Sequence, residues 1–95
     1  MLVIKEEAAE EIRQPQLWYE VQRPGLGDRF RVEVLICLRH IEVHPSMFAV
    51  RREPFRPARL KKFPYIIWYT IDIVDVVVYR VRHEKQRPLK RFIGR

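Results

Sequence analysis

Lysine and arginine stand out in this 95-residue chain, because their number and placement suggest binding to an anionic group. Residues 51–95 hold 13 Lys and Arg against 4 Asp and Glu, whereas residues 1–50 hold 6 against 8. The two halves therefore carry net charges of +9 and −2. Such an asymmetry suggests an acidic or polyanionic partner for the second half of the chain.

Histidine and cysteine offer less chemistry. His40 and His44 are four residues apart on an expected helix, but no further ligands accompany them, so we predict neither a metal site nor a cofactor. Cys37 is the only cysteine and lies in a stripe of apolar residues at helical spacing. It is expected to be an inert packing residue.

Two helices are expected to precede the strands. Apolar spacing predicts the first from Glu6 to Gln22, with a kink or break near Gln14–Pro15 because proline removes a backbone hydrogen bond. The second is expected from about Asp28 to His44, and the short connection makes the pair an antiparallel hairpin. Its core stripe comprises Phe30, Val34, Cys37, Leu38 and Ile41.

The second half of the chain reads as strands. Tyr65–Ile71 and Val76–His83 are rich in β-branched and aromatic residues, which predicts a hairpin. Shorter strands are expected at Leu2–Ile4, Met47–Val50 and Ala58–Lys62. Helices first and strands later indicate an α+β fold with an antiparallel sheet, in a single domain over residues 1–95.

Alternation along the hairpin assigns its side chains to two faces, provided that no bulge intervenes. The core face would hold Tyr65, Ile67, Tyr69, Ile71, Val77, Tyr79 and Val81. The opposite face would combine Trp68 with Arg80 and Arg82. That face could receive an apolar side chain of a partner or stack nucleic-acid bases on the indole.

Hydropathy argues against a membrane-spanning or a secreted protein. No apolar stretch is long enough to cross a bilayer, and the N-terminus becomes acidic within a few residues, unlike a signal peptide. We therefore expect a cytoplasmic protein.

The segment Trp18–Phe30, which reads WYEVQRPGLGDRF, closely resembles the helix-hairpin signature of the RelE/ParE toxin superfamily. The resemblance is nearest to the ParE-like plasmid-stabilisation branch, and it continues at His44-Pro45, Arg56, Phe63-Pro64-Tyr65, Tyr69 and Val81-x-His83. It implies a toxin of a type II toxin–antitoxin pair. It also implies a helix hairpin packed on a curved antiparallel sheet, and neutralisation by a cognate antitoxin protein.

The superfamily divides by mechanism, and the resemblance favours one branch. ParE-like members poison DNA gyrase, whereas RelE-like members cleave mRNA on the ribosome. Nuclease-type members carry an arginine after the strand-opening aromatic and often another after the last strand, where this chain has Ile66 and Gln86. We therefore expect a toxin that acts by binding. The alternatives are a ribosome-dependent mRNA endonuclease and a non-toxic basic module that binds nucleic acid.

The resemblance, the strand faces and the charge pattern together suggest site residues. His83 matches a catalytic histidine of one nuclease branch, but a strand-capping role is favoured for it. The candidate cations for binding nucleic acid or another target are Arg56, Arg59, Lys61, Lys62, Arg80, Arg82, Lys85 and Arg87. Their alternative role is a solvated sheet edge that discourages aggregation.

A protein interface is also predicted. The outer face of the second helix carries Val32, Leu35, Ile36 and Val43, which cannot all join the core stripe. Together with Trp68 they could dock an antitoxin helix or a second copy of the toxin, in a homodimer or a heterotetramer with the antitoxin. Alternatively, a first helix reshaped by Pro15 would cover them.

Overall fold

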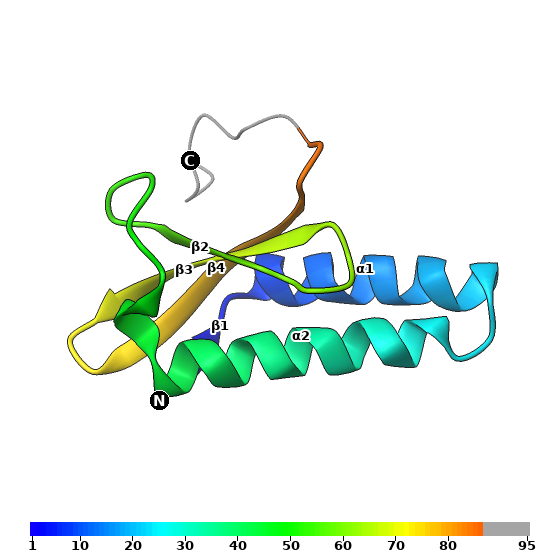
Figure 1. Cartoon of the computed structure of the whole chain (residues 1–95), viewed down its shortest axis with the longest axis horizontal. Coiled ribbons are helices and arrows are strands. Elements are labelled where there is room, and N and C mark those ends of the chain that lie inside the picture. The colour runs from blue at the N-terminus through cyan, green and yellow to red at the C-terminus, as the bar shows by residue number, and fades with distance from the viewer. Residues whose placement is uncertain (87–95) are drawn as a thin grey trace.

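The computed structural model describes residues 1–86 as two helices packed on one face of a four-stranded sheet (Figure 1). The helices are α1 (Glu6–Gln22) and α2 (Leu26–Val43), and a short 3-10 turn, η1 (Pro45–Met47), follows them. The strands are β1 (Leu2–Ile4), β2 (Arg56–Arg59), β3 (Tyr65–Asp72) and β4 (Asp75–His83). The predicted α+β fold, a helix hairpin on a sheet, is confirmed.

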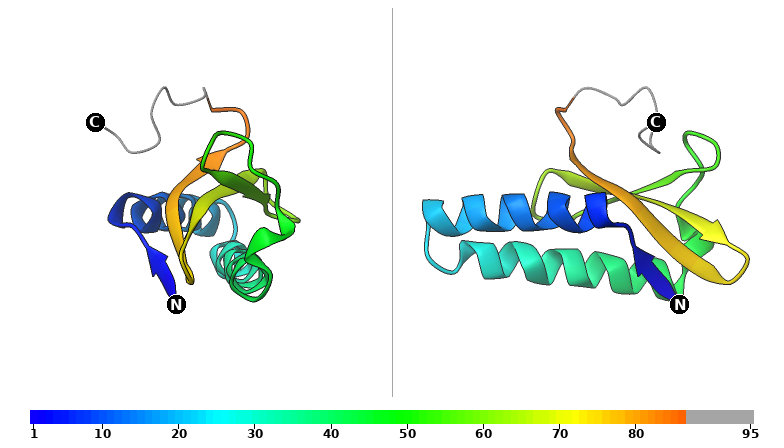
Figure 2. Two further views of the ribbon diagram at one scale, coloured as in Figure 1. Left: turned by 90° about the vertical axis from the view of Figure 1, so that its left-hand side faces the viewer. Right: turned by 180° about the vertical axis from the view of Figure 1, so that it is seen from behind.

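The sheet is mixed rather than wholly antiparallel, which corrects one detail of the prediction. Its strand order is β1-β4-β3-β2, and β1 runs parallel to β4 with Leu2 opposite Val76. The other neighbours are antiparallel. The chain between β1 and β4 contains both helices, β2 and β3, and a connection of that length allows the parallel pairing that a tight hairpin cannot make. Figure 2 shows the strands twisting across the helix pair.

Helix α1 has the predicted bounds, but it continues through Pro15 without the predicted break. Its N-terminal turn holds Glu6 and Glu7, which the helix dipole favours. Its C-terminal half packs closely on the start of α2, where a Cβ on Gly27 would lie 2.6 Å from the carbonyl oxygen of Gln16. This packing offsets the hydrogen bond that proline removes.

Helix α2 begins before the predicted Asp28 because a side chain of α1 caps it. The Glu20 carboxylate accepts hydrogen bonds from the backbone N–H groups of Gly25 and Gly27, both at 3.0 Å. Gly25 has a positive φ of 90° at the cap position, which glycine adopts without steric cost. The core stripe is confirmed, with Phe30, Val34, Cys37, Leu38 and Ile41 all buried.

A bulge decides which residues of β4 enter the core. Trp68 lies opposite Arg80, but the next residue, Tyr69, lies opposite Val78, so Tyr79 is an extra residue in β4. The alternation of β4 therefore reverses at this point. Val76, Val78 and Val81 are buried, and the prediction that Val77 and Tyr79 belong to the core was wrong.

The segment after α2 also differs from the prediction. Residues 47–50 form no strand, and β2 begins at Arg56 rather than Ala58. Tertiary contacts hold this segment, because the Tyr69 hydroxyl donates to the Pro45 carbonyl at 2.5 Å and the Arg56 guanidinium donates to the Phe48 carbonyl at 2.6 Å. Neither contact is visible in local sequence patterns. None of the helices in residues 1–86 combines the length and hydropathy of a membrane span.

Candidate functional site

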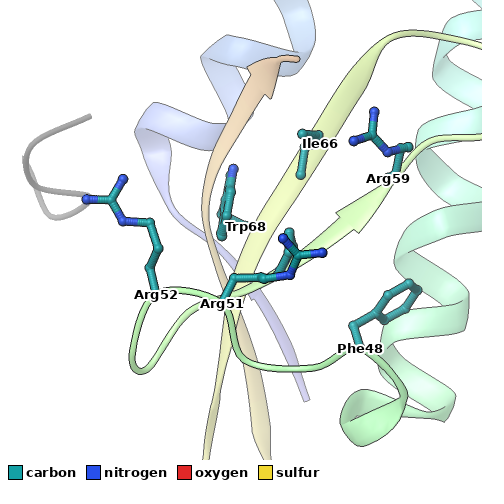
Figure 3. Close-up of a pocket in the computed structure, with 7 residues that line it drawn as sticks. Phe48, Arg51, Arg52, Arg59, Ile66 and Trp68 are labelled. Carbon is teal, nitrogen blue, oxygen red and sulfur yellow. The ribbon is translucent and has the colours of Figure 1, made fainter. Parts of the chain in front are cut away.

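The sheet face turned away from the helices carries a hollow bordered by arginines, which we call the arginine hollow (Figure 3). Its volume is about 520 Å³. The lining residues are Phe48, Arg51, Arg52, Pro57, Arg59, Ile66 and Trp68. Apolar groups thus form the floor and guanidinium groups the rim, and no carboxylate is among the lining residues. A surface of this kind suits an anionic partner that also presents an apolar side chain.

Backbone and side-chain contacts fix the loop that carries Arg51 and Arg52. The backbone N–H groups of both residues donate to the Phe55 carbonyl, at 3.0 and 3.3 Å, and the Phe55 ring packs on Tyr79. Arg56 holds the start of the loop through the Phe48 carbonyl. In Figure 3 the side chains of Arg51 and Arg52 extend from this loop in different directions. The two cations are therefore presented by a fixed backbone.

Strand pairing adds further cations beside the hollow. Ile66 on β3 lies opposite Arg59 on β2 and opposite Arg82 on β4, so the three side chains form one row across the sheet. Arg59 makes an ion pair with Glu84, with 62% of its side chain still exposed. Burial, together with nearby Arg80, lowers the pKa of Arg82. Positive charge therefore accumulates on this face.

His83 lies on the other side of the sheet, in a groove against α1 that we call the histidine groove. Its ring packs edge-on against Tyr65, which in turn packs on Phe30 in the core. The lining residues are Glu10, Glu11, Gln14, Pro15, Trp18, Tyr65, Val81, His83 and Gln86, around a volume of about 450 Å³. Burial, and to a lesser extent Tyr19, raises the pKa of Tyr65. The lining holds two carboxylates, Glu10 and Glu11, which pair with Arg13 and Arg80, and no Lys or Arg lines the groove, so it differs in charge from the arginine hollow.

The histidine is engaged at the strand end. Its Nδ1 accepts a hydrogen bond from the backbone N–H of Lys85 at 3.0 Å, and its own N–H donates to the Gln86 side-chain oxygen at 2.7 Å. These contacts fit the capping role favoured for it.

Arg80 is tied to α1 instead of facing solvent. Its guanidinium makes hydrogen bonds and an ion pair with the Glu11 carboxylate, which also accepts the backbone N–H of Val81 at 2.8 Å. The side chains are only 17% and 23% exposed. The hydrogen bonds that the guanidinium donates to Glu11 raise the pKa of Arg80. Arg80 thus joins α1 to the edge of β4 beyond the end of β1.

The other predicted cations are dispersed. Lys61 and Lys62 are exposed in the turn between β2 and β3, and Lys85 is exposed in the turn after β4. Arg56 supports the loop from inside. Arg87 lies outside the described residues.

The predicted interface residues fall on two separate surfaces. Trp68 lines the arginine hollow, whereas Val32, Leu35, Ile36 and Val43 lie exposed on α2. Helix α1 does not cover these four residues, so the alternative based on Pro15 is excluded.

Sequence reasoning missed Phe48, Arg51 and Arg52 as members of the site. The expected strand at 47–50 obscured the loop that brings them over β3. The adjacent arginines, placed shortly before two prolines, were the available signal of a basic loop. In residues 1–86, no three His, Cys, Asp or Glu side chains are grouped as metal ligands would be.

Comparison with known proteins identifies the family. The family described as the ParE toxin of the type II toxin–antitoxin system parDE matches residues 2–88. Among solved structures, the fold resembles that of a chain in the "Chromosomal ParDE TA system from P. aeruginosa", with a TM-score of 0.77 and 12% sequence identity. That alignment covers 86% of this chain and 92% of the other. No curated protein matches by sequence. The chain therefore belongs to the ParE toxin family of type II toxin–antitoxin systems.

Proposed function

We propose that this chain inhibits growth by binding a macromolecular target, that the target is DNA gyrase, and that a cognate antitoxin neutralises it. The observation that carries the proposal is the separation of His83 from the arginine hollow. The histidine groove and the arginine hollow share no lining residue, and the sheet lies between them.

Cleavage of RNA at a 2′-hydroxyl needs an acid or base and several cations at the same phosphate. His83 has carboxylates beside it in the histidine groove, and its Nδ1 is already hydrogen-bonded to the backbone of Lys85. Arg59 lies on the opposite face of the sheet, next to Ile66. This arrangement supports action by binding over the mRNA endonuclease that was the alternative.

The arginine hollow is the surface we assign to target binding. Its three arginines lie around an apolar floor that includes Trp68, and aromatic and arginine side chains are enriched where binding energy concentrates. The same surface would attract an acidic segment of an antitoxin, whose binding would exclude the target. The antitoxin and the target are then expected to compete.

The decisive experiment separates gyrase poisoning from mRNA cleavage. The purified chain should increase covalent gyrase–DNA complexes on supercoiled plasmid, and its induction should switch on an SOS reporter. His83→Ala should leave both effects within about twofold of wild type, whereas loss of a general acid or base costs about 100-fold or more.

Two results would contradict action by binding to gyrase. Rapid translation arrest with codon-phased mRNA cuts, abolished by His83→Ala, would contradict the proposal and establish the endonuclease. Absence of any growth defect in a folded chain would favour the non-toxic module.

A further inference from the structure

Helix α2 carries a second apolar surface that the proposed target site does not use. Val32, Leu35, Ile36 and Val43 are 45%, 50%, 43% and 55% exposed, on the side of α2 opposite its buried stripe. The spacing of Val32, Ile36, Arg39 and Val43 is four, three and four residues, as along the seam of a coiled coil. Both views in Figure 2 place α2 at the margin of the molecule, so another helix could approach this side.

Ionisable residues border this seam on both flanks. One flank carries Arg31 and Glu42, and the other carries Glu33 and His40. Within residues 1–86, Glu42 and His40 form no ion pair, and Arg31 has only a long contact of 3.9 Å to exposed Asp28. These groups are therefore available to a partner.

We propose that α2 pairs with α2 of a second copy of this chain, antiparallel, about a twofold axis between Ile36 and Cys37. In an antiparallel pair related by a twofold axis, each flank meets the same flank of the other helix. A residue of one helix then lies level with the residue of the partner helix for which the two numbers sum to 73. Arg31 meets the partner's Glu42, and Glu33 meets the partner's His40, each contact occurring twice by symmetry.

The apolar residues lie within two positions of the same register. The two Ile36 side chains lie beside the axis, and Val32 lies two residues, about 3 Å along the helix, from the level of the partner's Val43. Arg39, the one charged residue in the seam, lies near the partner's Ile36, where its aliphatic stem can cover the isoleucine and its guanidinium can reach water. A parallel pair would instead bring the two Arg39 cations together, which disfavours it.

The charge pattern favours a second copy over an antitoxin helix as the occupant. The flank with Arg31 and Glu42 complements itself in charge, and on the other flank the His40 ring can donate a hydrogen bond to the partner's Glu33; only a second copy necessarily supplies these groups at the matching positions. The proposal concerns self-association and does not depend on which target the toxin binds.

A charge exchange tests both the interface and its register. Sedimentation velocity of the purified 95-residue chain should show a dimer whose fraction rises with concentration. Arg31→Glu or Glu42→Arg alone should weaken the dimer roughly tenfold, because each places like charges together. The double variant Arg31→Glu/Glu42→Arg should recover the wild-type dissociation constant. Residues 31 and 42 are three helical turns apart in one copy, so recovery can arise only between copies.

Ile36→Glu should abolish the dimer while circular dichroism remains that of the folded chain. Leu17→Glu is the control, since Leu17 is an exposed apolar residue of α1, at 59% against 43% for Ile36, and its substitution should leave the dimer unchanged. A wild-type chain that stays monomeric at all concentrations would overturn the proposal. So would a double variant that fails to recover, or an Ile36→Glu variant that impairs only antitoxin binding. Gyrase assays do not enter this test, so its failure is separate from failure of the proposed function.

Discussion

At the scale of single residues, surroundings rather than residue type decide what each reactive group can do. His83 could serve as an acid or base, yet it caps a strand end between Tyr65 and the backbone of Lys85. Cys37 could serve as a nucleophile, yet it is 8% exposed among apolar side chains of α2. Burial, with a smaller effect of Glu33, raises the pKa of the thiol to about 11.

This raised pKa predicts an unreactive thiol. At pH 8 only about one thiol in 1,000 would be ionised, against roughly a quarter for a free cysteine, and only the thiolate reacts readily. Labelling of the native chain by a disulfide reagent should be at least about 100-fold slower than labelling of the chain unfolded in guanidinium. Cys37→Ser gives the background. Fast stoichiometric labelling of a chain that stays folded would contradict the burial.

At the scale of elements, one carboxylate completes the sheet edge that β1 leaves open. Strand β1 pairs with β4 only over Val76–Val78. Beyond this pairing, the Glu11 carboxylate of α1 accepts hydrogen bonds from the Arg80 guanidinium and from the Val81 backbone N–H. A helix side chain thus takes the place of a neighbouring strand and hides an edge that could otherwise pair with another chain.

Removing this carboxylate should therefore destabilise the fold. Glu11→Ala would leave a half-buried arginine without its counter-charge and a backbone N–H without an acceptor, at about 2–4 kcal/mol in the free energy of unfolding. Urea denaturation measures the effect. Glu10→Ala is the matched control one position away, because the hydrogen bonds that Glu10 accepts from Arg13 and Gln14 are exposed on α1 and their loss should change little. Equal effects of the two substitutions would contradict the role of Glu11.

At the scale of the whole molecule, charge is sorted between two faces. The helix side presents Glu6, Glu7, Glu10 and Glu11 at the start of α1, and the far side of the sheet presents the arginine hollow. This separation orients the molecule toward an anionic partner through the arginine side and keeps the acidic side away from it.

Binding through the arginine hollow should accordingly depend on salt. The double substitution Arg51→Ala/Arg52→Ala should weaken binding to gyrase roughly tenfold at about 0.1 M salt and less at about 0.5 M, because salt screens exposed charges. Arg23→Ala/Arg29→Ala, at the exposed turn between the helices and the start of α2, makes the same change in net charge at a distant site and should have little effect. Equal losses from both sites would indicate a response to net charge alone.

The sequence by itself determined the helix hairpin, the core stripe of α2, the main strands and the family. These features depend on periodic burial and on a signature local to residues 18–30, and both can be read along the chain. Only the tertiary structure decided the parallel pairing of β1, the bulge at Tyr79 and the loop that brings Arg51 and Arg52 over Trp68. It likewise placed His83 and the arginines on opposite faces of the sheet. The physical reason is that each of these depends on contacts between residues far apart in the chain, such as Tyr69 with Pro45 and Glu11 with Val81, whose energies leave no periodic trace in the sequence.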